Sequence, residues 1–407
     1  MATGGAGGEP ASTSFRLSAK DRYLHFAIAT ASNGLLLGQS PSVGGKPELV
    51  HFDSTGKPQW SQQLSAMDPE FQLRGGTRRT DDGYALAAEA QPNGGPGVVV
   101  TLSAAGQVAW SKTYAAISKF NQISQTSDGG YLVRGDTGFG PATKAAVVRL
   151  DAQGNVQWGA SYLPPGNSHD LGSVATSDDG FVFLASLDPQ TDAMAMLKLD
   201  SQGKLAFAKT VKVSPLLASA ASTLALPGGG FIAALLSFDS SFDAVIVVVD
   251  SKGDVLTSQR YPGLGSPSMI VADSNSGYLI AGLDAGATAG FWWAKVDATG
   301  AFNTVRRTPE ASPGFSTRPL GLAFKTDGSF LMASSHTENN DWWAIIDAMD
   351  PSGKPCPLSQ TPSASKATLQ TTTTDGGGSF SALSVSATTY PLTQSSFTPA
   401  FALVCGS

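Results

Sequence analysis

A short polar turn, followed by an aromatic residue or leucine and then an apolar run, recurs along the whole chain. The clearest copies read DDGYALA from residue 81, DGGYLV from residue 128 and DDGFVFL from residue 178. Self-similarity at a fixed period indicates a repeat architecture, in which each unit is one supersecondary element. The first residues after the turns are Leu35, Tyr84, Tyr131, Phe181, Phe231, Tyr278, Phe330 and Phe380, which lie 47 to 52 residues apart.

A second signature follows each of these turns, and it consists of an apolar strand, an Asp-x-x-Gly turn and often an aromatic residue. It reads VHFDSTGKPQW from residue 50, VVRLDAQGNVQW from residue 147 and LKLDSQGKLAF from residue 197. Aspartate accepts hydrogen bonds from its own backbone two residues on, and glycine supplies a positive φ, so this spacing fits a tight turn. Each repeat therefore contains two hairpins.

The third repeat shows the complete unit, with strands expected at 120–127, 131–136, 145–151 and 155–162. All four alternate or run apolar, and no helical periodicity is present. Four antiparallel strands repeated without helices are typical of a propeller blade. Eight repeats thus predict an all-β protein that is a single eight-bladed β-propeller.

The ends of the sequence predict how the ring closes. The eighth repeat supplies three strands, near 366–374, 380–388 and 396–405, whereas one surplus strand lies at 14–18. We expect this N-terminal strand to complete the last blade and so to remove the open edges of the ring. The predicted domains are a flexible leader over 1–13 and the propeller over 14–407.

Composition narrows the classes of function and compartment. Only 14% of the residues are charged and the net charge is -6, which lacks the basic footprint of a nucleic-acid-binding protein. No apolar run is long enough to cross a bilayer. The Gly/Ala/Ser/Thr-rich leader fits the remainder left after removal of a signal peptide or a lipid-bearing cysteine, or an ordinary chain end.

The two cysteines, Cys356 and Cys405, also bear on the compartment. We expect them to form a disulfide, with two buried thiols as the alternative. Together with the low charge, this pair favours a secreted, periplasmic or cell-surface protein, with any lipid anchor outside the given sequence.

The two signatures resemble the repeats of a bacterial secreted β-propeller family, and more distantly the tryptophan-docking repeats of eight-bladed quinoprotein dehydrogenases and of an outer-membrane assembly lipoprotein. Trp60, Trp110 and Trp158 match the docking position, whereas Phe207, Thr257 and Pro357 occupy it later, so docking is expected to be incomplete. The quinone and calcium of the dehydrogenases find no counterpart among the residues. The resemblance implies a fold and leaves the function open.

A search for catalytic chemistry gives no candidate. No nucleophile elbow, zinc-protease helix, P-loop or dinucleotide fingerprint occurs, and the four histidines lie in different repeats without metal-ligand spacing. We therefore expect no catalytic residue, no metal and no cofactor, and we expect a protein that is not an enzyme.

Five basic residues fall at matching positions near the start of the innermost strand of their repeats: His25, Arg74, Lys119, His169 and Arg318. They predict a weakly basic channel mouth that binds an anionic group, more strongly below about pH 6.5 because histidine then becomes charged. The alternative is a set of ordinary solvated residues.

Trp292 and Trp342 each open an expected strand beside a second tryptophan. Because neighbouring side chains on a strand point to opposite faces, one of each pair could form an aromatic platform, and core packing is the alternative. The sequence thus favours a monomeric binding or scaffold protein that takes a protein or glycan partner on one propeller face. A lectin-like module and an enzyme with a site in the channel mouth are the alternatives.

Overall fold

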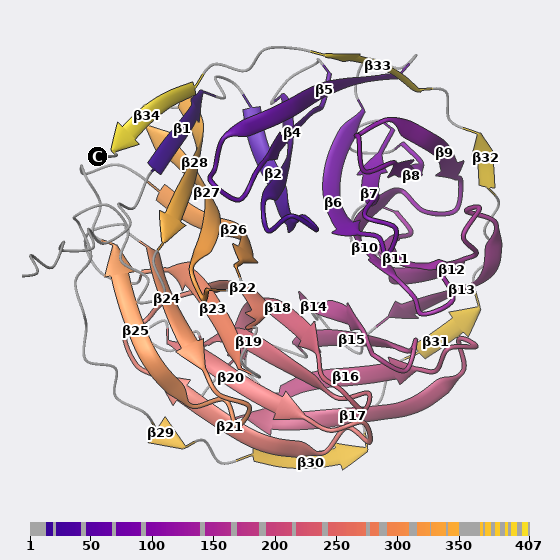
Figure 1. Cartoon of the computed structure of the whole chain (residues 1–407). Helices are drawn as coiled ribbons and strands as arrows, with labels where there is room; N and C mark the ends of the chain where they lie inside the picture. The colour runs from indigo at the N-terminus through magenta and orange to yellow at the C-terminus, as the bar shows by residue number, and fades with distance from the viewer. Residues whose placement is uncertain are drawn as a thin grey trace, which may run out of the picture.

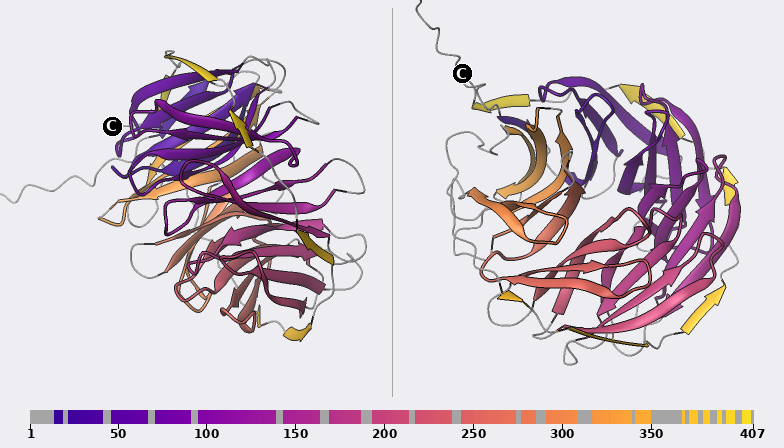
Figure 2. Two further views of the ribbon diagram at one scale, coloured as in Figure 1. Left: turned by 90° about the vertical axis from the view of Figure 1, so that its right-hand side faces the viewer. Right: turned by 60° about the horizontal axis from the view of Figure 1, so that its bottom comes forward.

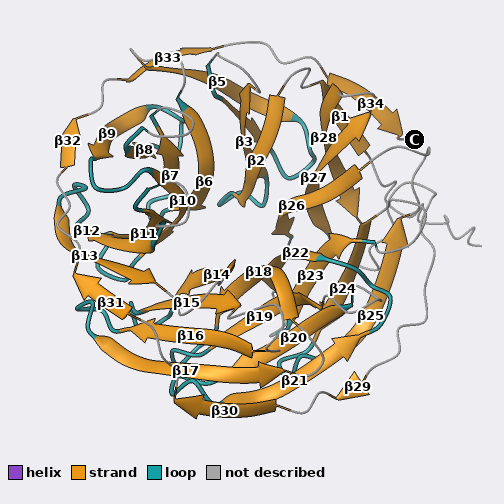
Figure 3. Ribbon diagram, turned by 180° about the vertical axis from the view of Figure 1, so that it is seen from behind, coloured by secondary structure: helices purple, strands orange, loops and turns teal. Residues whose placement is uncertain are grey.

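The protein is a β-propeller in which sheets are arranged around a central axis (Figure 1). The computed structural model describes residues 14–18, 22–41, 46–66, 71–90, 95–138, 143–163, 169–186, 193–213, 217–237, 243–273, 277–284, 291–308, 316–325, 327–338, 341–349, 367–368, 371–375, 379–382, 387–389, 392–396 and 401–405. Its ordered elements are strands, as Figure 3 shows from the opposite side. The described part of the chain has no helix that could cross a membrane.

Seven sheets form the ring, and consecutive strands run from the axis outward in each. Blade one contains β2 (Arg22–Ala29), β3 (Leu35–Pro41), β4 (Glu48–Phe52) and β5 (Pro58–Ala66). Blade two contains β6 (Gln72–Arg78), β7 (Tyr84–Glu89), β8 (Gly97–Leu102) and β9 (Val108–Tyr114). Blade three contains β10 (Lys119–Gln125), β11 (Tyr131–Asp136), β12 (Ala145–Leu150) and β13 (Val156–Leu163).

The next three blades repeat this order. Blade four contains β14 (His169–Ala175), β15 (Phe181–Ser186), β16 (Ala193–Leu199) and β17 (Leu205–Val213). Blade five contains β18 (Leu217–Ala225), β19 (Phe231–Ser237), β20 (Ala244–Val249) and β21 (Val255–Tyr261). Blade six contains β22 (Pro267–Ala272), β23 (Tyr278–Leu283), β24 (Phe291–Val296) and β25 (Phe302–Thr308).

The ring closes in blade seven, through a strand from the N-terminus. The seventh repeat supplies β26 (Ser316–Phe324), β27 (Phe330–Glu338) and β28 (Asp341–Met349), and β1 (Ser14–Ser18) pairs antiparallel with β28. Leu17 lies opposite Ala344 and is buried in the cluster between blades seven and one. Closure by the N-terminal strand was predicted, but the blade that it completes is the seventh.

The prediction of eight blades is wrong, because the eighth repeat forms no blade. It forms six short strands instead: β29 (Ala367–Thr368), β30 (Thr371–Asp375), β31 (Ser379–Ala382), β32 (Ala387–Thr389), β33 (Leu392–Ser396) and β34 (Phe401–Cys405). They add in turn to the outer edges of blades five, four, three, two, one and seven, so the tail encircles the ring against the direction of the blades (Figures 1 and 2). We call residues 367–405 the belt.

The polarity of the belt explains this outcome. A propeller blade is packed on both faces and needs central strands that are apolar throughout, such as the fully buried β8 and β20. The belt strands read TTTTD in β30 and LTQSS in β33, which are too polar for that position. Such strands can still pair through their backbones with an exposed sheet edge.

The two faces of the ring differ. On one, which we call the turn face, the connections within a hairpin are five residues long, as at 126–130 and 151–155, and are closed by backbone hydrogen bonds. On the other, the loop face, the connection between the second and third strands varies from 339–340 to 137–144. Variable connections on a rigid scaffold are where binding residues usually gather.

The predicted tryptophan docking joins neighbouring blades at the turn face. The indoles of Trp60, Trp110 and Trp158 each lie against a glycine of the following blade, respectively Gly106, Gly154 and Gly203. Phe207 lies against Gly253 in the same way, so docking extends one blade further than expected. At the next position the Thr257 hydroxyl donates a hydrogen bond to the carbonyl of Thr299 instead, at 2.9 Å.

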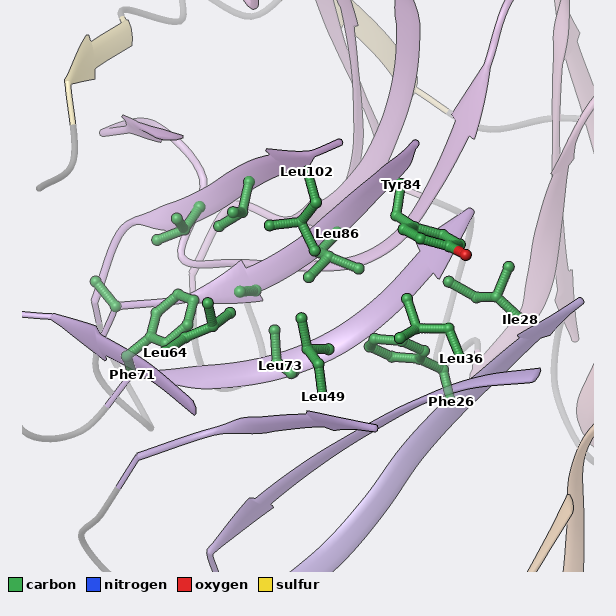
Figure 4. Packing of buried hydrophobic residues seen from close by; sticks show 14 residues of the cluster. Phe26, Ile28, Leu36, Leu49, Leu64, Phe71, Leu73, Tyr84, Leu86 and Leu102 are labelled. Carbon is green, nitrogen blue, oxygen red and sulfur yellow. The ribbon is translucent and has the colours of Figure 1, made fainter. Parts of the chain in front are cut away.

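Apolar side chains fill the spaces between blades. Between blades one and two, for example, Phe26, Leu36 and Leu49 pack against Leu73, Tyr84 and Leu86 (Figure 4). Burial of this kind is the main favourable term in folding. The interblade cores hold the inner strands rigidly, and these strands carry the candidate site.

Candidate binding site at the loop face

Each of the seven inner strands is interrupted by a β-bulge near its loop-face end. The pairing with the second strand shifts at Leu24/Phe26, Leu73/Gly75, Phe120/Gln122, Asp170/Gly172, Leu217/Ser219 and Ser219/Ser222, Pro267/Met269 and Pro319/Gly321. The bulges thus fall at His25, Arg74, Asn121, Leu171, Ala221, Ser268 and Leu320. A bulge re-aims the side chain of the extra residue, and bulges are common beside functional sites.

The residues at these bulges divide the ring into two parts. In blades one to three they are His25, Arg74 and Asn121, whereas in blades four to seven they are Leu171, Ala221, Ser268 and Leu320. The inner strands of the first three blades are neighbours, since β6 contacts both β2 and β10. Polar chemistry is therefore concentrated on one side of the ring.

In blades two and three, the bulge residue binds a carboxylate at the end of the second strand. Arg74 Nε donates to Glu89 Oε1 at 3.0 Å, and its Nη2 bonds the same oxygen. Asn121 Nδ2 donates to Asp136 Oδ2 at 3.1 Å, and Lys119 Nζ lies 3.3 Å from that oxygen. Both carboxylates follow their bulge residue by 15 positions.

Blade one reaches a similar result with other positions. Arg22 Nη2 lies 2.8 Å from Glu48 Oε1, and its Nη1 donates to the carbonyl of Lys46 at 3.2 Å. Glu48 also accepts hydrogen bonds from the amides of Gln39 at 2.8 Å and Gln63 at 3.2 Å. Four groups therefore fix this carboxylate and, through it, the guanidinium of Arg22.

Exposure differs within each ion pair. The side chains of Glu48, Glu89 and Asp136 are 6%, 1% and 16% exposed, whereas those of Arg22, Arg74 and Lys119 are 24%, 31% and 33% exposed. Solvent thus meets the cations, and the carboxylates lie behind them. We call Arg22, Arg74 and Lys119 the braced cations.

His25 has a different environment. Burial, and to a smaller extent the positive charge of Arg74, lower the pKa of His25 to about 4. Its Nε2 is buried without a hydrogen-bond partner in the structure. His25 is therefore neutral at physiological pH, so the expected strengthening of anion binding below pH 6.5 cannot come from this residue.

The other predicted site residues are placed only in part. His169 begins β14 and Arg318 lies in β26, but their side chains fall outside the described residues, as does that of Trp342. Cys405 ends β34 opposite Ser14, while Cys356 lies outside the described residues, so the disulfide stays a prediction.

Trp292 offers no aromatic platform. Its side chain is fully buried between blades five and six, and its Nε1 donates to the carbonyl of Leu283 at 3.0 Å. Trp293 is equally buried and packs edge-on against Phe330. The alternative of core packing is therefore correct for this pair, because both faces of β24 are covered by neighbouring blades.

The sequence analysis missed the three carboxylates that brace the cations. It considered only the inner strands, which carry no acidic residue among the predicted ring positions, and concluded that the mouth was simply basic. The recurring distance of 15 residues from Arg74 to Glu89 and from Asn121 to Asp136 was visible in the sequence. Among the described residues, no group of acidic, histidine or cysteine side chains could hold a metal ion.

Comparisons with known proteins reach the fold alone. No protein-family model matches the sequence, and neither does any curated protein. Among solved structures, the chain is similar to the WD40 domain of Toxoplasma gondii coronin, with 11% identity over 86% of this chain and 88% of that one, at a TM-score of 0.47.

Two further solved structures show likeness of the same order. The WD40 domain of Neurospora crassa Pan2 is 11% identical over 79% of this chain and 88% of its own, at a TM-score of 0.47. Quinohemoprotein alcohol dehydrogenase from Comamonas testosteroni is 10% identical over 84% and 78%, at a TM-score of 0.42.

Proposed function

We propose that this protein is a non-enzymatic scaffold that binds a macromolecular partner on its loop face, on the side of blades one to three. The observation that carries the proposal is the division of the seven bulge positions, with His25, Arg74 and Asn121 on that side. The charged groups beside them are fixed before any partner arrives, which lowers the entropic cost of binding.

The rest of the surface supports this choice of face. The turn face consists of short turns whose aspartates bond their own backbone, as Asp151 does with Gln153 and Asn155. The outer edges of six blades are paired with the belt or, in blade seven, with β1 and then the belt. Both regions spend their polar groups on internal bonds.

The expected compartment remains part of this proposal. A secreted, periplasmic or surface-attached monomer fits the low charge and the two cysteines of the sequence. The lectin-like alternative has lost Trp292 as a platform, because that side chain is buried. An enzyme with a site in the mouth finds no further support among the described side chains.

Site-specific photo-crosslinking tests the proposal. A benzophenone amino acid replaces Tyr23, which is 39% exposed at the loop-face end of β2, or Gln153, which is exposed in a turn on the opposite face. We expect crosslinks to a discrete partner, in extracts of the native cells and envelope, from position 23 and none from position 153. Crosslinks from position 153 alone, or none from either position, would contradict the proposal.

A further inference from the structure

We propose that the braced cations form a binding site for an acidic segment of a partner protein, a stretch of peptide that carries several carboxylates. The inference deepens the proposed function and rests on it, since it states the chemistry of the same site. Its basis is the way in which charge is layered, with Arg22, Arg74 and Lys119 in front of Glu48, Glu89 and Asp136.

The ion pairs are neutral overall, and this neutrality does not prevent anion binding. Each carboxylate is at most 16% exposed, so an approaching ligand reaches the cation first. Arg74 uses Nε and Nη2 toward Glu89, and a guanidinium has five N–H donors, so donors remain for a ligand. Lys119 likewise has three N–H donors and one carboxylate neighbour among the printed contacts of the site, Asp136.

Bracing also selects the geometry of the ligand. A long basic side chain loses rotamer freedom when it binds, and this cost is smaller where a buried carboxylate already holds the side chain. Planar guanidinium groups match carboxylates in a bidentate arrangement, which favours carboxylate ligands at Arg22 and Arg74.

The three cations lie in consecutive blades at one level of the ring. His25 of blade one is close enough to Arg74 of blade two for the charge to act on it. Gly75, beside Arg74, approaches the backbone carbonyl of Asn121 in blade three so closely that an added Cβ would lie 2.6 Å from it. An extended chain crossing the three inner strands would meet the cations in sequence, and an isolated carboxylate would meet only one.

The test uses variants that leave the net charge unchanged. In the inner variant, Arg74→Gln is combined with Glu89→Gln, and Lys119→Gln with Asp136→Asn, so that no buried carboxylate loses its partner. In the outer control, Arg78→Gln is combined with Asp82→Asn, which removes an exposed pair from the turn-face end of the same strand β6. Thermal melting establishes that each variant is folded.

The ligand is a deca-glutamate peptide, with deca-serine and an oligogalacturonate of equal charge as comparisons, and affinity is measured by calorimetry at low and high salt. We expect the full-length protein to bind deca-glutamate, more weakly in high salt, and the inner variant to lose at least about tenfold in affinity. The outer control should bind as the wild type does.

Equal affinity of the inner variant and the wild type, or an equal loss in the outer control, would overturn the proposal. Preference for the oligogalacturonate would assign the site to a polysaccharide instead. A partner that still crosslinks from position 23 while deca-glutamate fails to bind would retain the proposed function and remove only the acidic segment.

Discussion

Trp110 in blade two lies directly over Gly154 in blade three, where an added Cβ would be 2.6 Å from the indole. The backbone of Gly154 also has a positive φ of 76°. The glycine of the Asp-x-x-Gly turn thus serves two purposes, since it forms the turn and leaves room for the aromatic ring of the preceding blade.

The first prediction separates these two purposes. Gly129 has a similar φ of 82° but no atom within 4 Å of an added Cβ. Gly129→Ala should therefore cost only the backbone penalty, about 1–2 kcal/mol in the free energy of unfolding. Gly154→Ala should cost a further 1–3 kcal/mol or so, because the indole must shift. Denaturant unfolding of both variants measures the difference, and equal losses would show that docking contributes nothing.

The second prediction concerns a buried arginine at the turn face. Arg149 is 5% exposed and lies 2.7 Å from Asp128, whose carboxylate is 53% exposed. Asp128→Asn should lower the free energy of unfolding at pH 7 by about 1–2 kcal/mol, a modest value because the carboxylate is half exposed. The exposed pair of Arg78 and Asp82 gives the control Asp82→Asn, which should have a smaller effect.

Acid unfolding of the same variant adds a check. The backbone N–H of Gly130 and the Thr126 hydroxyl, followed by Arg149, hold the pKa of Asp128 below its usual value. A lowered carboxyl pKa stabilises the fold above the pKa of the unfolded chain, and the effect is lost as the pH falls through the folded value. The variant should thus lose less stability than the wild type below about pH 4.

The third prediction follows from His25. Between pH 6.5 and about 4, the unfolded chain binds a proton at this residue and the folded protein does not, because burial lowers its pKa. Stability must therefore fall as the pH decreases through this window, by up to about 3 kcal/mol for this residue. His25→Gln should flatten that slope in unfolding experiments from pH 7 to 4. An unchanged slope would show that His25 titrates normally.

The fourth prediction tests the belt. Deletion of residues 366–407 removes the fifth strand from blades one to five but leaves their interblade cores complete. The ring should remain folded, with faster amide exchange at β5, β9, β13, β17 and β21 and with self-association through the freed edges. β25 of blade six pairs with no described belt strand and is the internal control. Equal loss of protection at β25 would mean that the whole ring had opened.

The fifth prediction concerns the N-terminal strand. Deletion of residues 1–18 removes β1 from between β28 and β34, so both strands lose their partner. This variant should melt lower and aggregate, because blade seven loses Leu17 from its core and exposes an edge. Deletion of residues 1–12 alone should leave melting unchanged. A monomeric protein with unchanged melting after the longer deletion would contradict this closure.

The sequence predicted the parts of the fold that depend on local chemistry. Turns such as 126–130 and 151–155 form where glycine and aspartate indicated them, and Trp60 docks as its spacing suggested. The blade count failed because Phe380 matches the repeat motif while the residues around it are too polar for a buried strand. Counting motifs could not detect this, since the motif records the turn and leaves the burial of the following strands undetermined.

The candidate site was predicted in position and incompletely in chemistry. Counting back from the repeat anchors placed His25 and Arg74 at positions that prove to be bulges. The partners Glu89 and Asp136 come from the neighbouring strand of the same blade, and their effect on charge depends on which side chain is buried. Exposure of this kind arises from packing between blades, which no single repeat specifies.

The position of β1 also determines when the chain can finish folding during synthesis. Residues 14–18 are among the first to leave the ribosome, yet one neighbour, β28, ends at Met349 and the other, β34, at Cys405. The nascent N-terminus therefore waits through almost the whole of translation, while blades one to six can assemble beside it. A chain interrupted before β28 would carry an unpaired strand at each end, so quality control could distinguish it from the finished protein by those two edges.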